Sequence, residues 1–387
     1  MNFVMEGNNL IISTKGSIDS NNASDFGNEA DKIINSNKFE KLILDFKEIA
    51  YVSSAGLRQI LRLKKTNPNF KVINVNSEVY EVFEMTGFSE MMEVEKAFRE
   101  LSVEGCEIIG EGSNGIVYRV TPDSIVKVYK NPDALDDIKR ERELARTALV
   151  LGINTAISYD VVKVGDKYGS VFELLNSKSL TKLINEDKTK LDMYIKVFAD
   201  ILKGIHNTEV KNDVLPSAKK IAISWVEWLK GKIEDSTYDK LHKMLDDVKE
   251  SNKIIHGDYH TNNLHYSNGE AILIDMDTLA CGNPIFDFSS IFLAFRGFGE
   301  LRHERVENFL HLDWETANLI WEKLLVYYFN TTNEKVINDV KNKAMTLGYV
   351  RMLRRTIKRE SDDKELIDFC QKKLKETIDK VDSLSIE

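Results

Sequence analysis

Residues 256–263 of the chain read HGDYHTNN, and residues 273–277, a short distance downstream, read LIDMD. Together they supply one aspartate, Asp258, an asparagine five residues later, Asn263, and a second aspartate, Asp275. A phosphoryl-transfer site needs these groups, because one carboxylate positions the attacking hydroxyl while an amide and another carboxylate hold Mg²⁺ on the nucleotide phosphates. We therefore predict that Asp258 is catalytic and that Asn263 and Asp275 bind Mg²⁺.

The composition is that of a globular protein made of more than one domain. The chain has 387 residues, of which 42% are hydrophobic and 30% charged, and this length predicts two or three domains. The net charge of -9 argues against a nucleic-acid partner, which requires a basic face. Three widely spaced cysteines without a CxxC pair indicate reduced thiols and a cytoplasmic location. We find no signal peptide and no apolar run of about 18 residues, so we expect no membrane partner.

Residues 1–100 alternate short apolar segments with amphipathic ones. Because strands separated by helices form parallel sheets, this alternation predicts an α/β domain with a mostly parallel sheet. The expected strands cover residues 10–12, 42–46, 71–75 and 91–95, and the expected helices cover residues 23–34, 54–65 and 77–85.

A short join at residues 101–105 contains one glycine and no flexible Gly/Ser tract. We therefore expect two domains, at 1–100 and 106–387, that lie close together. A small sheet-rich lobe followed by a larger helical lobe is the outline of an α+β bilobed kinase fold. The expected elements are strands at 116–120, 125–129, 161–164 and 170–174, a helix at 135–151, and mostly helices after residue 180.

Residues 110–117 read GEGSNGIV, which matches the kinase pattern G-x-G-x-x-G-x-V. Glycines are needed there because the loop folds tightly over phosphates and exposes backbone N–H groups. A dinucleotide-binding loop would continue into a helix, whereas residues 116–120 are β-branched and strand-like. Taken alone, the pattern also fits a plain glycine-rich hairpin. The predicted nucleotide contacts are Gly110, Gly112, Ser113, Gly115 and Val117.

Lys127 lies on the next expected strand, where a kinase places the lysine that binds the α- and β-phosphates. Lys130 is the competing candidate, but strand alternation turns it to the opposite face. The lysine requires a glutamate partner on the following helix. We choose Glu143 for this role, with Glu141 as the alternative.

Other polar residues around the opening motif have supporting roles. His256 and His260 have the i,i+4 spacing of a zinc pair, but the glutamate of H-E-x-x-H and an obvious third ligand are missing. We expect the two histidines to brace the loop through hydrogen bonds instead. Asp277 is expected to assist the metal, and Asp287 to bind backbone groups of the catalytic loop.

These motifs, in this order, resemble the aminoglycoside phosphotransferase and choline kinase-like family over about residues 106–370. The resemblance implies ATP and Mg²⁺ as cofactors and transfer of the γ-phosphate to a hydroxyl, and it leaves the acceptor open. The chain differs from eukaryotic protein kinases at Gly257, where those have arginine, and at Met276-Asp277, which replaces the Phe-Gly of D-F-G. No A-P-E segment follows, so we expect no activation loop.

The resemblance also places the adenine-binding hinge and the acceptor pocket. The hinge is expected near residues 172–175, and the acceptor pocket in the variable helices at about 176–250 and 290–370. Acidic pockets for cationic acceptors are common in this family. Glu300, Glu304 and Glu307 fit such a pocket, and they fit a solvated helix face better.

Residues 51–57, which read YVSSAGL, resemble the loop of the STAS domain, a domain named after sulfate transporters and anti-sigma-factor antagonists. The resemblance covers about residues 1–100 and makes Ser54 the candidate phosphosite. Ser53 stands where regulated members often have aspartate. A phosphate on Ser54 would add about two negative charges at a helix N-terminus, which tolerates anions. This change would switch the binding of a protein partner.

We therefore predict an ATP- and Mg²⁺-dependent phosphotransferase with a regulatory STAS domain, acting on a small molecule or a protein serine. In a specific version, one chain phosphorylates Ser54 of another. The alternative is a signalling scaffold that binds nucleotide and whose STAS domain binds a regulatory partner. Antibiotic resistance ranks last, because it leaves the STAS domain unexplained.

Overall fold

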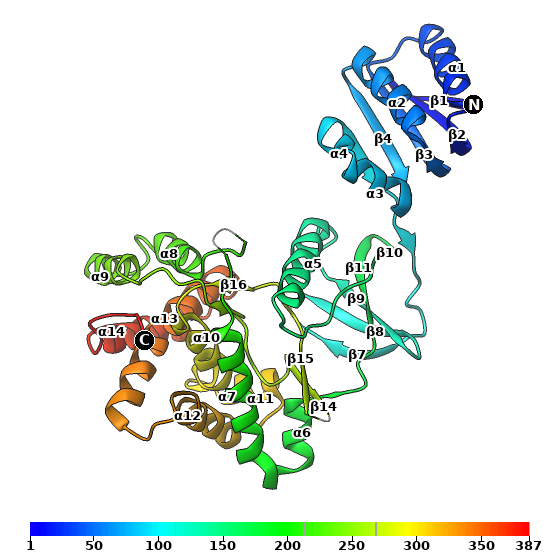
Figure 1. Ribbon diagram of the computed structural model, residues 1–387. Coiled ribbons are helices and arrows are strands. Elements are labelled where there is room, and N and C mark those ends of the chain that lie inside the picture. The colour runs from blue at the N-terminus through cyan, green and yellow to red at the C-terminus, as the bar shows by residue number, and fades with distance from the viewer. Residues whose placement is uncertain (113, 212–213, 268, 387) are drawn as a thin grey trace. The chain divides into compact units, whose positions relative to one another are not determined.

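The computed structural model describes residues 1–112, 114–211, 214–267 and 269–386 (Figure 1). These residues form two compact units. The first comprises Met1–Cys106 together with Asp160–Gly169, and the second comprises Glu107–Tyr159 together with Ser170–Glu387.

The first unit is built on a five-stranded sheet with the order β1-β2-β3-β4-β5. The first two strands are antiparallel, and β2, β3, β4 and β5 follow one another in parallel, which confirms the predicted mostly parallel sheet. Helices that follow the strands bury their apolar faces against the sheet. The elements are β1 (Asn2–Glu6), β2 (Asn9–Ile18), α1 (Ala23–Asn35), β3 (Lys41–Val52), α2 (Ser54–Thr66), β4 (Phe70–Val75), α3 (Ser77–Met85), α4 (Phe88–Met91) and β5 (Glu93–Lys96).

The sequence pattern missed β1, because all its side chains are exposed and give no alternation of apolar and polar positions. A second strand was missed at the end of the predicted domain. There β6 (Arg99–Glu100) pairs in parallel with β10 (Asp160–Val164). The Arg99 guanidinium also lies 3.0 Å from the Asp160 carboxylate.

The second unit begins with a small antiparallel sheet followed by a long helix. The strand β8 pairs with both β7 and β9, and a further strand, β11, lies beside β9. The predicted hairpin and the predicted helix are both present. The elements are β7 (Glu107–Glu111), β8 (Gly115–Thr121), β9 (Ser124–Tyr129), α5 (Leu135–Val150) and β11 (Lys167–Glu173), which belongs to this unit from Ser170 onward.

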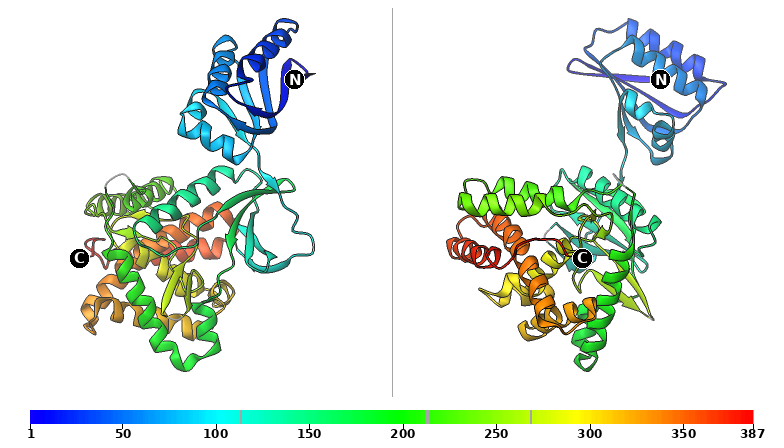
Figure 2. Two further views of the ribbon diagram at one scale, coloured as in Figure 1. Left: turned by 45° about the vertical axis from the view of Figure 1, so that its right-hand side comes forward. Right: turned by 60° about the vertical axis from the view of Figure 1, so that its left-hand side comes forward.

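The remainder of this unit is mostly helical, as predicted (Figure 2). Its short strands pair as β12-β14-β15 and β13-β16, and they carry the loops of the two opening motifs. The strands are β12 (Lys178–Ser179), β13 (Ile254–Ile255), β14 (Leu264–Ser267), β15 (Glu270–Leu273) and β16 (Ala280–Cys281). The helices are α6 (Leu180–Glu186), α7 (Leu191–Asn207), α8 (Ala218–Trp228), α9 (Asp235–Asp246), α10 (Ile285–Phe295), α11 (Glu304–Leu310), α12 (Trp314–Phe329), α13 (Glu334–Arg359) and α14 (Lys364–Ile378).

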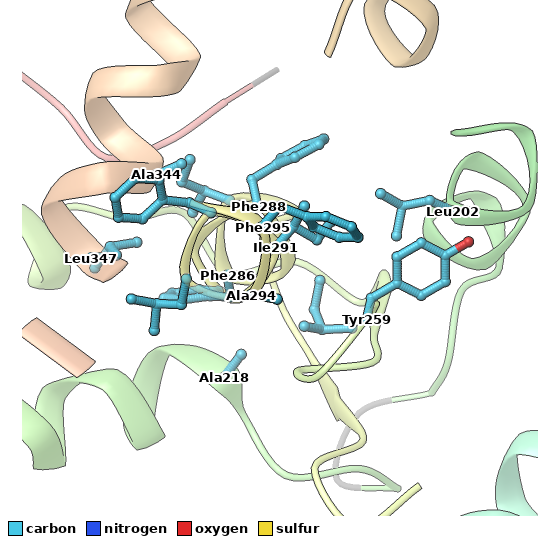
Figure 3. Close-up of a cluster of buried hydrophobic side chains, with 14 of the residues drawn as sticks. Leu202, Ala218, Tyr259, Phe286, Phe288, Ile291, Ala294, Phe295, Ala344 and Leu347 are labelled. Atoms are coloured by element: carbon cyan, nitrogen blue, oxygen red, sulfur yellow. The ribbon is translucent and has the colours of Figure 1, made fainter. Parts of the chain in front are cut away.

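The centre of the helical lobe is α10, in which every residue is buried. Figure 3 shows its aromatic side chains pointing outward from the helix axis in several directions, with Leu202 of α7 and Leu347 of α13 around them. Tyr259, from the middle of the catalytic motif, packs into the same core and donates a hydrogen bond to the Phe198 carbonyl at 2.8 Å. The loop that carries Asp258 is therefore anchored in the close-packed core around α10.

Within the described residues, no helix is both long and apolar enough to cross a membrane.

Candidate active site

Lys127 of β9 joins two acidic groups from distant parts of the second unit. Its Nζ lies 3.1 Å from Glu141 Oε1 on α5 and 3.2 Å from Asp275 Oδ1, just after β15. Burial alone would lower the pKa of Lys127, but Asp275 and Glu141 outweigh it and hold the pKa above its ordinary value. The ammonium is therefore charged and fixed in position at neutral pH.

The helix partner of Lys127 is Glu141, so our choice of Glu143 was wrong. Glu143 is exposed, because two residues along an α-helix turn a side chain by about 200°. Glu141 instead shares the buried face of α5 with Ile138 and Leu144. Tyr129 donates a hydrogen bond of 2.7 Å to Glu141 Oε2 and so fixes this carboxylate from the other side.

We expect Glu141→Gln to lower kcat/KM for ATP by about 10- to 100-fold, because it removes a charge-assisted pair worth about 1.5–3 kcal/mol. Glu143→Gln is the matched control, and it should stay within about twofold of the wild type. Steady-state kinetics with ATP as the varied substrate measures both. Equal losses in the two variants would contradict the assignment of Glu141.

The glycine loop folds back on itself at the end of β7. The Gly112 N–H donates to the Gly115 carbonyl at 2.9 Å. A Cβ at Gly115 would lie 2.7 Å from the Val128 carbonyl, whereas a Cβ at Gly110 or Gly112 would meet nothing closer than 3.8 Å. Packing therefore requires glycine at 115, and the other two positions leave space beside the backbone for phosphates. Ser113 lies outside the described residues.

A large cleft brings together most of the predicted nucleotide contacts. It has a volume of about 1260 Å³, and the glycine loop, Val117 and Lys127 line it together with Asn263 and Asp275. Residues of the expected hinge, Phe172–Leu175, line it as well. The Leu174 N–H is already bound to the Asp123 carbonyl at 2.9 Å, so this donor is taken up within the protein.

The donor set beside Lys127 suits a divalent cation. Asn263 Nδ2 donates to the Asp258 carbonyl at 3.0 Å, which leaves Asn263 Oδ1 as a possible ligand. Asp275 has a left-handed backbone with φ of 64°, a conformation rare outside glycine and frequent at functional sites. Burial and the nearby Asp275 carboxylate raise the pKa of Asp277 above its usual range. Oxygen ligands with excess negative charge are what Mg²⁺ prefers.

Asp258 lies on the catalytic loop among positively polarised groups. His260 Nε2 is 3.6 Å from Asp258 Oδ2, and Arg351 Nη2 of α13 is 3.9 Å from Asp258 Oδ1. The Asp258 N–H also donates to His256 Nδ1 at 3.3 Å, which is the expected bracing hydrogen bond for His256, whereas His260 has the 3.6 Å contact with the Asp258 carboxylate. Burial would raise the pKa of Asp258, but His260, Arg351 and His256 outweigh it and keep the pKa below its usual range. The group is therefore a carboxylate at neutral pH.

Asp287 of α10 holds the backbone of this loop, as predicted. Its carboxylate accepts hydrogen bonds from the His256 N–H at 3.0 Å and from the Gly257 N–H at 2.6 Å. His206 of α7 adds a third contact at 2.9 Å. Gly257 has φ of 80°, and a Cβ there would lie 2.6 Å from the Thr278 carbonyl. The tight turn thus explains why glycine occupies this position.

We expect Asp287→Asn to destabilise the fold by about 3 kcal/mol at pH 7, because it leaves a fully buried pair with His206 broken. The contact with His206 keeps the pKa of Asp287 low even though burial opposes this. A carboxylate with a lowered folded-state pKa stabilises the protein above its unfolded pKa of about 4 and loses this effect as the pH falls further. The difference in unfolding free energy between the variant and the wild type should therefore become smaller below about pH 4.

Chemical denaturation of both proteins across this pH range checks the prediction. The exposed Asp362 provides the control variant, Asp362→Asn, which should match the wild type throughout. A gap that stays constant down to about pH 3 would show that the carboxylate charge is not the stabilising feature.

The candidate acidic pocket is not formed. The Glu300 carboxylate forms an ion pair with Arg296 Nε at 2.8 Å and accepts a hydrogen bond from the Tyr349 hydroxyl. Glu307 accepts a hydrogen bond from the Trp314 N–H at 3.2 Å, and Glu304 is exposed. These residues therefore do not form a site for a cationic acceptor. The solvated helix face is found for Glu304 and Glu307 on α11, whereas Glu300 precedes that helix and is paired inside the lobe.

In the first unit, Ser53 caps α2 by accepting a hydrogen bond from the Gly56 N–H at 3.3 Å. Ser54 is the first residue of this helix, and its side chain is exposed. A Cβ at Gly56 would lie 2.7 Å from the Ile18 carbonyl, so glycine is required where the helix approaches β2. The candidate phosphosite is therefore accessible and lies at a helix N-terminus.

Sequence reasoning missed three supporting residues of the site: Tyr129, His206 and Arg351. None of them belongs to a short motif, and each reaches its partner through the tertiary fold. Glu141 was different, because the buried spacing of Ile138, Leu144 and Ala145 already indicated its face of α5.

Two family models match the chain. The model described as "Phosphotransferase enzyme family" matches residues 105–320, and the model of the STAS domain matches residues 2–101. A comparison with curated proteins gave no match.

Solved structures with a similar fold are aminoglycoside phosphotransferases. A thermostable mutant of APH(4)-Ia in its apo form is 14% identical with a TM-score of 0.50, and the match covers 71% of this chain and 94% of that one. A ternary complex of another APH(4)-Ia mutant with ADP and hygromycin B is 13% identical with a TM-score of 0.51, covering 72% and 94%. A complex with AMP-PNP and hygromycin B is 14% identical with a TM-score of 0.50, covering 72% and 94%. At these identities the likeness concerns the fold.

The family model covers the glycine loop, Lys127 and both opening motifs, and it agrees with the bilobed fold and with the predicted resemblance. The chain therefore belongs to the phosphotransferase enzyme family, and its residues 2–101 form a STAS domain.

Proposed function

We propose that the chain transfers the γ-phosphate of ATP to a hydroxyl of an acceptor held by the helical lobe. The observation that carries this proposal is the position of Lys127 between Glu141 and Asp275 in a cleft covered by the glycine loop. A lysine fixed in this way can bind the α- and β-phosphates, and the loop offers backbone N–H groups to them. The adenine nucleotides in the similar structures support ATP as the donor.

Asn263 and Asp275 would hold Mg²⁺, with Asp277 as a further candidate ligand. When bound there, Mg²⁺ would neutralise negative charge on the β- and γ-phosphates. Asn263 is oriented for this role by its hydrogen bond to the Asp258 carbonyl. The same hydrogen bond connects Asn263, a proposed metal ligand, to Asp258, which is proposed to face the acceptor.

Asp258 would orient the acceptor hydroxyl and take its proton during transfer. As a carboxylate with a low pKa it is a weak base. A weak base suffices, because phosphoryl transfer passes through a loose transition state in which the hydroxyl keeps its proton until late. Tyr259, which is anchored in the core, and the backbone hydrogen bonds that Asp287 accepts hold the loop of Asp258 in the required geometry.

The STAS domain would serve as the regulatory part. Ser54 is exposed at a helix N-terminus, where a phosphate is tolerated and changes the charge that a protein partner meets. We propose that a protein partner binds here and that Ser54 is a candidate acceptor, reached from another chain. Cys106, Cys281 and Cys370 form no disulfide within the described residues, which suits a reducing compartment such as the cytoplasm.

Incubation of the full chain with γ-labelled ATP and Mg²⁺ tests these proposals. Wild type, Ser54→Ala and Asp258→Ala are compared, and label on the protein is followed over time. Label that appears in the wild type and disappears in both variants supports Ser54 as an acceptor. Label that persists in Ser54→Ala excludes Ser54 as the sole site.

The scaffold alternative is separated by calorimetry with ATP and Mg²⁺ together with an assay for ADP. Binding without any ADP formation over a broad panel of hydroxyl acceptors would favour the scaffold. Binding followed by ADP formation favours the transferase.

A further inference from the structure

Cationic side chains of α13 pack against two tryptophans of α8, beginning beside the loop that carries Asp258. Arg351, Arg354 and Lys358 are spaced at three and four residues on α13, so they share one face of that helix. Arg351 lies over the Trp225 ring at 5.6 Å, and Arg354 lies over the Trp228 ring at 5.8 Å. Both tryptophans belong to α8, which contacts α13.

Trp228 is the centre of this cluster. Besides Arg354, it has the Lys358 Nζ at 5.0 Å and the Lys232 Nζ at 4.3 Å from its ring. Each cation–π contact is favourable by itself, but three cations around one indole repel one another. We call Arg351, Arg354, Lys358 and Lys232 the basic cluster.

The basic cluster lacks carboxylate partners. In the part of the chain that the structure describes, no acidic group forms an ion pair with Arg354, Lys358 or Lys232, and Arg351 has only Asp258 at 3.9 Å. Nearby arginines behave differently, since Arg302 is paired with Asp363 at 2.7 Å. In a chain with a net charge of -9, this local excess of positive charge is unusual.

Arg354 provides a second, independent sign of a missing ligand. Its Nε is buried and has no hydrogen-bond partner among the described residues. Buried donors are normally satisfied, and an unsatisfied one in a functional region calls for an explanation. The Arg354 Nη1 and Nη2 atoms also have no hydrogen-bond acceptor among the described residues, and an anion bound beside Arg354 would be their acceptor, whereas the Nε itself is enclosed by its neighbours.

Arg351, the first residue of the basic cluster along α13, lies beside Asp258, which is proposed to hold the acceptor hydroxyl. Arg351 Nη1 donates to the Gly257 carbonyl at 2.7 Å, directly before Asp258. Arg354 and Lys358 follow at about 5 Å and about 10 Å along the helix axis, at 1.5 Å per residue. The basic cluster therefore presents cationic groups at increasing distance from the loop that carries Asp258.

We propose that the small-molecule acceptor of this site is a hydroxylated compound with an anionic group, a phosphate or a carboxylate, bound by Arg354 and Lys358, about 5 and 10 Å beyond Arg351 along α13. This inference rests on the proposed function and names the substrate class of the same site. It agrees with the absence of a formed acidic pocket at Glu300 and Glu307. Arg351 acts as a positioning residue, because it holds the loop through Gly257.

The binding test uses inorganic phosphate and the full chain saturated with ADP and Mg²⁺, so that the nucleotide phosphate positions are already filled. Calorimetry and tryptophan fluorescence follow the titration, since Trp225 and Trp228 lie in the basic cluster. We expect saturable binding to the wild type and binding at least about 10-fold weaker in Arg354→Gln and Lys358→Gln. The exposed Arg146 on α5 gives the matched control, Arg146→Gln, which should bind phosphate as the wild type does.

Equal phosphate affinity in all four proteins, or no saturable binding to the wild type, overturns the proposal. Lys358 is exposed, so Lys358→Gln keeps the test valid even if Arg354→Gln fails to fold.

The transfer test compares ADP formation with pairs of acceptors that differ only in the anion. Glycerol is paired with glycerol 3-phosphate and with glycerate, and ribose with ribose 5-phosphate. We expect the anionic member to be preferred at least about 10-fold in kcat/KM, with the preference lost in Arg354→Gln. The phosphate and carboxylate members tell which anion is bound. Preference for kanamycin or a neutral polyol would overturn the inference and leave the proposed function intact.

Phosphate binding that depends on the basic cluster, with no ADP formed from the panel and no label transferred to Ser54, would instead reject the proposed function and keep the anion site. If no member of the panel is a substrate, the phosphate titration alone decides.

Discussion

Asp258→Asn is expected to bind ATP and Mg²⁺ with wild-type affinity and to transfer phosphate about 1000-fold more slowly, since general-base residues contribute about 10²–10⁴-fold. The substitution keeps the size of the side chain. It removes the negative charge that orients the acceptor hydroxyl and takes its proton. Asp258 is not among the residues that line the nucleotide cleft, so nucleotide binding should not depend on it.

Single-turnover measurements of ADP formation give the transfer rate, and calorimetry gives the affinity for the nucleotide. Asp362→Asn is the control for loss of one exposed carboxylate, and it should behave as the wild type does. If Asp258→Asn weakens nucleotide binding by as large a factor as it slows transfer, Asp258 contributes to binding ATP rather than to orienting the acceptor hydroxyl.

Asp275→Asn is expected to remove the dependence of ATP binding on Mg²⁺. Asp275 contacts Lys127 at 3.2 Å and has the unusual left-handed backbone, so it combines a proposed metal ligand with a partner of the phosphate-binding lysine. Metal stabilisation of transferred phosphate is worth several kcal/mol. We therefore expect transfer at least about 1000-fold slower than in the wild type.

The sharpest test compares ATP affinity with Mg²⁺ and with EDTA. In the wild type, EDTA should weaken binding, whereas the Asp275→Asn variant should show nearly the same affinity under both conditions. If EDTA weakens ATP binding to the variant as much as to the wild type, residues other than Asp275 bind the metal. Glu143→Gln, which changes an exposed carboxylate near the site, serves as the control here.

The fold and the family could be predicted because their signals are local. The glycine pattern at residues 110–117, the lysine on the following strand and the two motifs at 256–263 and 273–277 each lie within a few residues. The parallel sheet of the first unit also follows from alternation along the chain. The family models confirm the predicted STAS domain and the phosphotransferase relationship.

One detail that was wrong has a local signal: Ile138, Leu144 and Ala145 set the buried face of α5, which includes Glu141 and excludes Glu143. The details that were missing depend on contacts over long distances in sequence. Arg351 reaches Gly257 across 94 residues, and His206 reaches Asp287 across 81. No local pattern marks such pairs, since they arise only when α7, α10 and α13 pack together.

The acceptor side of the site illustrates the same limit. From the sequence, Glu300, Glu304 and Glu307 were candidates for binding a cationic acceptor. The structure pairs Glu300 with Arg296 and instead leaves Arg354 and Lys358 without carboxylate partners among the described residues. Which charges are neutralised is a property of packing, and it decides the class of acceptor that we propose.

Phosphate is expected to move from ATP to a hydroxyl of an acceptor other than water. The most direct measurement determines ADP and inorganic phosphate in the same reaction of the full chain with ATP, Mg²⁺ and the acceptor panel. We predict more ADP than inorganic phosphate, with the difference recovered as a phosphate ester and abolished in Asp258→Asn. Equal amounts of ADP and inorganic phosphate, or no ADP despite tight ATP binding, would contradict the account.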